Sequence, residues 1–370
     1  MQNFTSLRDW VRSHKVELAL SVRVTSAALV SLVIALALHL RLPLWAVLTS
    51  IIVTQLSVGR SLKTTRDYLI GTLGGAVYGG AVAILVPHTG EGALLFVLVL
   101  AVAPLAFVAA LNPAYNAATV TAIIVLLLPL MNRGSTLDSA IDRVFEVAVG
   151  AVTGLAVSFL VVPSRAQDQV RAGVAEVLDM MALALGQLLR GITQGRDTAE
   201  LHRLQDGIGH TLSGLNAIAG EAQRERALRL SPGPETGPLL RTTLRLRHDL
   251  VMVGRASIEP LPQDIFDHLG KPLSAVEQAI CTHLRGAATA LRLQKPPPEA
   301  RALESALADY SAAVTSVREA GLTRALSAEV AERFFALGFS LEQMRQNFDD
   351  LDRRVAEWAG VAPPGAEGAD

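Results

Sequence analysis

The sequence predicts an all-α protein in two parts: a polytopic bundle of six transmembrane helices, and after it a cytoplasmic antiparallel helical bundle. Two observations predict this division. Hydrophobic residues make up 51% of the chain and charged residues 18%, which is too apolar for a soluble globule and too charged for a membrane bundle alone. Long apolar runs fill the first 163 residues, whereas amphipathic helical stripes fill the rest.

Six apolar runs predict the membrane spans, although several are shorter than the roughly 20 residues that a bilayer crossing needs. The fifth run is marginal, so five spans are the alternative count. The predicted spans are 24–40, 44–58, 68–86, 93–111, 117–130 and 144–162, within a transmembrane domain over 24–163. We further expect an amphipathic N-terminal helix over 1–23, a cytoplasmic helical domain over 164–360 and a disordered tail over 361–370.

Basic residues predict the orientation, because Lys and Arg accumulate on the cytoplasmic side of membrane proteins. Nine fall in segments on the side of the N-terminus and three on the other side. The nine are Arg8, Arg12, Lys15, Arg23, Arg60, Lys63, Arg66, Arg165 and Arg171, and the three are Arg41, Arg133 and Arg143. We therefore expect a protein of a bacterial-type plasma (inner) membrane with both termini in the cytoplasm. The single cysteine, Cys281, suits a reducing compartment.

A repeat runs through the membrane part. The segment from Leu44 to Pro87 has a counterpart from Ala117 to Pro163, in which arginines, glycine pairs and terminal prolines recur 75 to 77 positions apart. Each copy would contain three helices, and an odd number makes the copies inverted in the membrane. A 3+3 inverted repeat is a common plan of transporters, whose site lies at the repeat interface.

Glycines recur at four-residue steps in the third and sixth predicted spans. These helix-packing positions are Gly71, Gly75, Gly79, Gly150 and Gly154. Small-residue stripes let helix backbones approach closely, within one chain or between two copies. The alternative is that a glycine face lines a permeation path.

The membrane part also resembles a known superfamily. Trp45 to Thr49 in the second span, followed by Arg66-Asp-Tyr-Leu-Ile-Gly71-Thr72-Leu-Gly-Gly75, is similar to the motif of the fusaric acid resistance and aromatic acid exporter superfamily. The resemblance implies export or conduction of organic anions without a cofactor. Long members carry two membrane bundles, so the single bundle here implies a homodimer. The second copy departs from the motif, with Ala148 and Gly150 where a Gly-Thr pair is sought.

Two arginines and one glutamate are the main transport candidates. Arg66 and Arg143 begin the third and sixth spans, and a guanidinium binds a carboxylate through two parallel hydrogen bonds. Alternatively, Arg66 anchors its helix and Arg143 pairs with Asp142 or Glu146. Glu146 lies about one turn into the sixth span, where it could carry a proton for coupled export or form a structural pair with Arg143.

Other polar and aromatic residues could line the path. The uncharged link containing Asn112, Tyr115 and Asn116 could dip into the membrane and face a cavity, or could be a plain turn. Trp45 and Tyr78 are candidates for a vestibule, and Trp45 equally suits an interfacial anchor.

Several function classes lack support. The sequence contains no P-loop, HExxH or GxSxG motif, so we expect neither an ATP-driven pump nor a hydrolase. His202, Asp206 and His210 share a helical face, but no fourth metal ligand is evident, so neither metal nor cofactor is expected. Nothing in the charge pattern favours nucleic acid as a partner. Arginines near the Ser231–Pro234 break could attract anionic lipid or substrate.

Three functions are consistent with these features. The first is a secondary transporter that exports small organic, possibly aromatic, acids and uses the proton gradient. The second is a passive anion channel of the same fold. The third is a membrane-anchored regulatory or interaction protein without flux, which requires a fully packed apolar bundle interior. The first two take an organic anion as partner, and all three the lipid bilayer.

The topology is testable with reporter fusions. A fusion after Pro87 should report the outside and a fusion after Pro163 the inside, because an odd and an even number of spans precede them. Matching signals at the two sites would refute the six-span topology.

Overall fold

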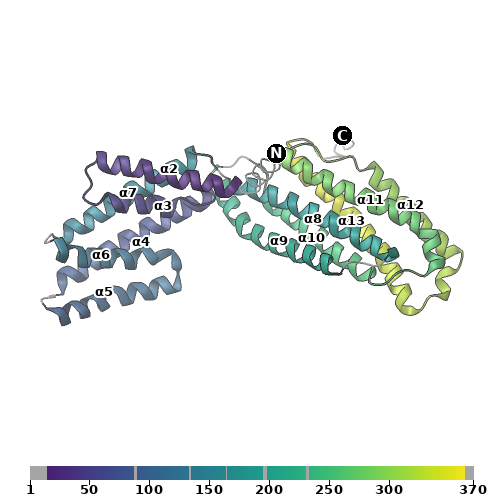
Figure 1. Cartoon of the computed structure of the whole chain (residues 1–370), viewed down its shortest axis with the longest axis horizontal. Coiled ribbons are helices and arrows are strands. Elements are labelled where there is room, and N and C mark those ends of the chain that lie inside the picture. The colour runs from purple at the N-terminus through teal and green to yellow at the C-terminus, as the bar shows by residue number, and fades with distance from the viewer. Residues whose placement is uncertain are drawn as a thin grey trace, which may run out of the picture. The chain divides into compact units, whose positions relative to one another are not determined.

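A computed structural model describes residues 15–86, 90–132, 135–163, 165–194, 198–230 and 233–362 of the chain. These residues form twelve α-helices and two short 3-10 helices, with no strand among them (Figure 1). The chain divides into two compact units, Met1–Arg165 and Ala166–Asp370. Most of the predicted N-terminal helix and of the predicted disordered tail lie outside the described residues.

The described residues of the first unit form six α-helices, one for each predicted span. They are α2 (Lys15–Ala37), α3 (Pro43–Val53), α4 (Val58–Leu85), α5 (Glu91–Leu111), α6 (Asn116–Asn132) and α7 (Thr136–Leu160), and the 3-10 helix η1 (Pro113–Tyr115) precedes α6. Caps explain several boundaries: Ser57 and Ser135 cap α4 and α7 through their hydroxyl groups. Pro43 occupies the first turn of α3, where its missing N–H costs nothing.

Length and composition identify a different set of spans from the predicted one. Five helices in the described parts of the chain are long and apolar enough to cross a membrane: α2, α4, α5, α7 and α8 (Ala166–Gln194). Helices α3 and α6 are apolar but short. Helix α8 was predicted to be cytoplasmic. Its apolar residues pack against α9, α10 and α11, and length and composition alone do not separate a span from the central helix of a bundle.

The two halves of the first unit pack in the same way: the short helix of each half lies on the long, glycine-containing helix of the other half. Helix α3 packs on α7, and α6 packs on α4. A Cβ added at Gly79 would lie 2.7 Å from Cα of Ala122, and one at Gly154 would lie 2.7 Å from the carbonyl oxygen of Ser50. Each short helix therefore lies directly against the glycine face of the long helix from the other half. The glycine stripes serve packing within the chain.

The first helix of each half, α2 or α5, packs on the same kind of helix pair. Helix α2 packs against α3 and α7, and α5 packs against α6 and α4. The repeat therefore includes α2 and α5 as corresponding helices, so that each half contains three.

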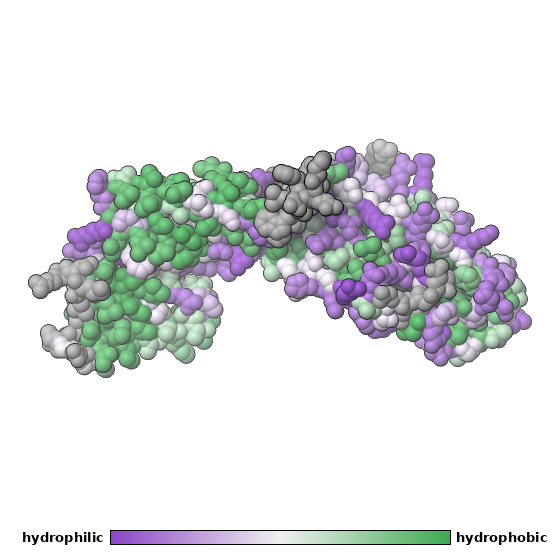
Figure 2. Space-filling model, in the orientation of Figure 1, coloured by the Kyte–Doolittle hydropathy of each residue, from purple (hydrophilic) through white to green (hydrophobic). Residues whose placement is uncertain are grey.

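The first unit buries several polar side chains and exposes many large apolar ones. Figure 2 shows this surface dominated by hydrophobic residues, and large side chains such as Phe96, Phe107 and Leu160 are more than half exposed. By contrast Arg23 and Arg143 are buried. A fully packed apolar interior, which the non-transporting alternative requires, is not what these helices form. Because Arg23 and Arg143 are buried, they no longer count among the basic residues of the flanking segments. Eight basic residues on the side of the N-terminus then remain against two on the other side, and the orientation stays a prediction.

The second unit is a helical bundle around one large apolar core. Its helices are α8, α9 (Thr198–Ala227), α10 (Thr236–Ala256), α11 (Gln263–Leu293), α12 (Arg301–Glu319) and α13 (Ala328–Ala359), with the 3-10 helix η2 (Leu322–Ala325) before α13. Helix α8 packs against α9, α10 and α11, while α13 packs against α10, α11 and α12. Apolar faces of its amphipathic helices form this core, which includes Val174 and Leu185 from α8 and Phe334 and Phe348 from α13.

The glycine contacts predict a matched pair of outcomes. An added methyl group at Gly75 or Gly150 would collide with the carbonyl oxygen of Ala118 or Ala46. Overpacking of this kind costs about 2 kcal/mol, so Gly75→Ala and Gly150→Ala should lower the heat-denaturation midpoint in detergent. Gly74→Ala is the control, since an added Cβ there meets nothing within 4 Å. Equal midpoints for all three variants would show that the close approaches do not stabilise the unit.

Candidate functional site

Arg143 forms the centre of a buried polar group between α3, α4 and α7. It lies on α7, two turns before Gly150, and only 2% of the residue is exposed. The guanidinium lies over the ring of Trp45 on α3, 4.3 Å from the ring centroid, a cation–π contact. Tyr68 on α4 also faces it. Neither Nε nor Nη1 of Arg143 has a hydrogen-bond partner among the described residues.

Glu146 lies one turn further along α7 and is 3% exposed. Its Oε1 accepts a hydrogen bond of 2.9 Å from the backbone N–H of Leu42, the residue before α3. A carboxylate at that position satisfies a donor that the helix cannot pair internally and interacts favourably with the helix dipole. Glu146 thus ties α7 to the start of α3.

The predicted ion pairs of Arg143 do not form. Asp142 pairs instead with Arg41, at 3.1 Å and largely in the open, and Glu146 is held by Leu42. Within the described ranges, no carboxylate oxygen lies within 4.0 Å of the Arg143 guanidinium. Leaving a buried cation without a close counter-ion is costly, so this guanidinium is suited to an anion from outside the chain.

Arg66 does not join this group. Its side chain is 70% exposed and forms an ion pair of 2.9 Å with its neighbour Asp67. The glycine contacts also set the correspondence between the halves: Gly75 matches Gly150 and Gly79 matches Gly154, so Tyr68, and not Arg66, matches Arg143. The two arginines are 77 positions apart, against 75 for the glycine pairs, so they do not occupy matching places in this correspondence.

The remaining predicted residues have separate structural roles or lie apart. The hydroxyl of Tyr78 donates to the carbonyl of Leu100 on α5. Asn112 caps η1, with Oδ1 accepting from the N–H of Ala114 at 3.1 Å. Tyr115 is half-buried and Asn116 exposed, and η1 packs against α4. The structure therefore brings together Trp45, Arg143 and Glu146, with Tyr68 as a member that the sequence interpretation missed.

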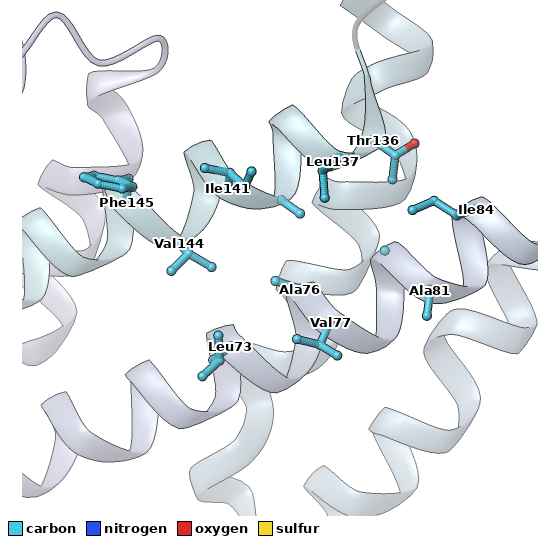
Figure 3. A pocket seen from close by; sticks show the side chains of 12 residues that line it. Leu73, Ala76, Val77, Ala81, Ile84, Thr136, Leu137, Ile141, Val144 and Phe145 are labelled. Atoms are coloured by element: carbon cyan, nitrogen blue, oxygen red, sulfur yellow. The ribbon is translucent and has the colours of Figure 1, made fainter.

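A separate apolar pocket of about 460 Å³ lies between α4 and α7 (Figure 3). Leu73, Val77 and Ile84 line it from α4, and Ile141 and Phe145 from α7, with Thr136 as the polar side chain of its wall. None of the predicted site residues lines this pocket. Its chemistry suits hydrocarbon and gives a carboxylate nothing to bind.

The second unit contains two buried polar pairs. His283 Nε2 and Asp352 Oδ1 lie 3.0 Å apart, and the Asn347 amide donates to Asp249 at 2.6 Å. Burial raises the pKa of Asp249, while the hydrogen bond from Asn347 opposes this shift. His202, Asp206 and His210 are exposed, and the described residues contain no group of three or more possible metal ligands. These pairs link helices of the bundle core.

The sequence of the chain matches a known protein family. The sequence profile of the fusaric acid resistance protein family matches residues 17–364, which is nearly the whole chain. Members of this family are membrane transporters of the efflux and resistance type and are not known as enzymes. Together with the apolar helices, the match identifies a multi-pass membrane protein. No curated protein matches the chain.

Proposed function

We propose that this chain, which belongs to the fusaric acid resistance protein family, exports small organic acids, including aromatic ones, through a site centred on Arg143. One observation carries the proposal: a buried guanidinium, stacked on Trp45, has two nitrogens without a partner among the described residues. A carboxylate would form a charge-assisted hydrogen bond with one of these nitrogens, whose N–H groups point to different sides of the guanidinium. The aromatic rings of Trp45 and Tyr68 would border the apolar part of the substrate.

The exchanged packing of the two halves supports this location. In transporters built from inverted repeats, the substrate site lies where the repeats meet. Arg143 belongs to the last helix of the second half, while Trp45 and Tyr68 belong to the first half. A change in packing between the halves would therefore alter the site directly.

Glu146 supplies a route to proton coupling. It is a buried carboxylate near the Arg143 guanidinium, and a bound substrate anion would bring a second negative charge to the same cation. Two negative charges near one cation repel each other, so proton uptake by Glu146 favours substrate binding. Linkage of this kind would make the flux of the anion depend on the pH difference across the membrane.

A passive anion channel of the same fold is the second candidate. The hydrogen bond between Glu146 and the N–H of Leu42 favours it, because a carboxylate that caps α3 has a structural role without titration. The polar interior of the first unit disfavours the third reading, a membrane anchor without flux.

We also propose the setting of the site. The chain would form a homodimer in the bacterial-type inner membrane, with both termini in the cytoplasm and the second unit there as well. Because the glycine faces of α4 and α7 are occupied by α6 and α3, the contact between two copies would use other lipid-facing surfaces.

The central residue is tested by efflux from proteoliposomes loaded with radiolabelled benzoate or related aromatic and aliphatic acids. Arg143→Lys keeps the charge but loses the planar donor group, so efflux should fall roughly tenfold, and Arg143→Gln should reduce it further. Arg66→Gln is the matched control, since it removes an exposed arginine and should leave the rate near wild type. If Arg143→Gln exports every acid at the wild-type rate, the site lies elsewhere.

Proton coupling is tested in the same vesicles with an imposed pH difference. Wild-type flux should change when the pH difference is imposed, because proton uptake by Glu146 favours anion binding, whereas Glu146→Gln should show flux that does not depend on the pH difference. Asp142→Asn, which alters an exposed carboxylate of the same helix, should keep the dependence. Wild-type flux that ignores the pH difference would favour the channel.

A further inference from the structure

Arg23 is a second buried arginine in the first unit, and the site around Arg143 does not use it. It lies on α2 within the apolar stretch Glu17–Ala37 and has 0% exposure. Its Nη2 donates to the backbone carbonyl of Leu56 at 3.0 Å. Neither Nε nor Nη1 has a hydrogen-bond partner among the described residues. The sequence interpretation had counted it as a residue of the cytoplasmic flank, because the apolar run begins at Val24.

The contact with Leu56 places the guanidinium at the N-terminus of α4. Ser57, the next residue, is the N-cap of this 28-residue helix, and its Oγ accepts from the N–H of Arg60 at 3.1 Å. The N-terminus of a long helix carries partial positive charge and favours anions. A buried cation and a helix N-terminus therefore act on the same small region.

The described residues supply no close counter-ion to Arg23. No carboxylate oxygen in the described part of the chain lies within 4.0 Å of this guanidinium. The nearest acidic residue along α4, Asp67, pairs with Arg66. A buried guanidinium without a counter-ion in an apolar helix is costly and is then usually functional. This environment suits an anion that comes from outside the protein.

Arg23 and Arg143 lie at opposite ends of α3. Arg143 contacts Trp45 in the first turn of α3, whereas Leu56 follows its last residue, Val53. The 11 residues of α3 correspond to roughly 16 Å of helix. Between these ends, the hydroxyl of Thr49 on α3 is fully buried and has no hydrogen-bond partner among the described residues.

We propose that Arg23 and the N-terminus of α4 form a second anion-binding site, which takes the carboxylate of an organic anion about one α3 length from Arg143. The assignment rests on the proposed export function and adds a second station to its path. An anion would pass from one buried guanidinium to the other along α3, so that neither end of the path needs to hold a desolvated carboxylate without a cation.

The site is tested by binding rather than by flux, with the purified full-length protein in detergent and benzoate as the probe. A ligand that binds only the folded state raises the heat-denaturation midpoint by an amount that grows with the ratio of its concentration to its dissociation constant. In an Arg143→Gln background, benzoate should still raise the midpoint, whereas neutral benzamide should not. Adding Arg23→Gln to that background should weaken the apparent affinity for benzoate at least tenfold.

Two variants make the result specific. Arg60→Gln, in the same background, removes an exposed arginine from the first turn of α4 and should leave the benzoate titration unchanged. Should Arg23→Gln fail to fold, Arg23→Lys keeps the charge with fewer donors and should weaken benzoate several-fold.

Three results would overturn the second site: no stabilisation of the wild type by benzoate, complete loss of stabilisation in Arg143→Gln alone, or a titration that Arg23 substitutions do not change. The export proposal is judged separately, because it fails only if wild-type proteoliposomes release no organic acid. Arg23-dependent binding in a protein without flux would keep the anion site and reject the exporter.

Discussion

The arrangement of the first unit depends on close approaches between helix backbones. Gly75 and Gly79 let α6 lie directly on α4, and Gly150 with Gly154 let α3 lie on α7. No side chain fits at these contacts, so the helix surfaces determine the spacing. The buried apolar cluster of this unit, around Val82, Val97 and Leu126, is small, whereas the apolar core of the second unit is large.

These approaches also position the polar groups. Because α3 lies on α7 at Gly150, Leu42 and Trp45 at its start face the preceding turns of α7, which carry Glu146 and Arg143. The corresponding approach of α6 to α4 brings Gly71 against Ala117, where the other half has its glutamate. The two halves share one packing plan but differ in charge. The proposed anion site in one half and the plain helix contact in the other would follow from that difference.

The sequence predicted the helices well and the site only in part. Apolar runs identified all six helices of the first unit, since side-chain chemistry alone decides which segments avoid water. The glycine steps predicted close packing, but not which helix would fill each face. Trp45, Arg143 and Glu146 come from separate predicted elements, and their proximity depends on the exchanged packing. Arg66 became a transport candidate because it begins a predicted span, and that position does not determine whether its side chain is exposed. Tyr68 lies 75 positions before Arg143, the same spacing that separates Gly75 from Gly150, and this spacing could have identified it.

The central claim is that Arg143 binds a carboxylate beside Trp45, and the fluorescence of Trp45 tests it most directly. In a protein with Trp10→Phe and Trp358→Phe, Trp45 is the remaining tryptophan, and its ring lies 4.3 Å from the Arg143 guanidinium. We predict a saturable change in emission as benzoate is added, no change with benzamide, and loss of the benzoate response in Arg143→Gln. An emission that benzoate leaves unaltered, or that responds equally after Arg143→Gln, would contradict the account.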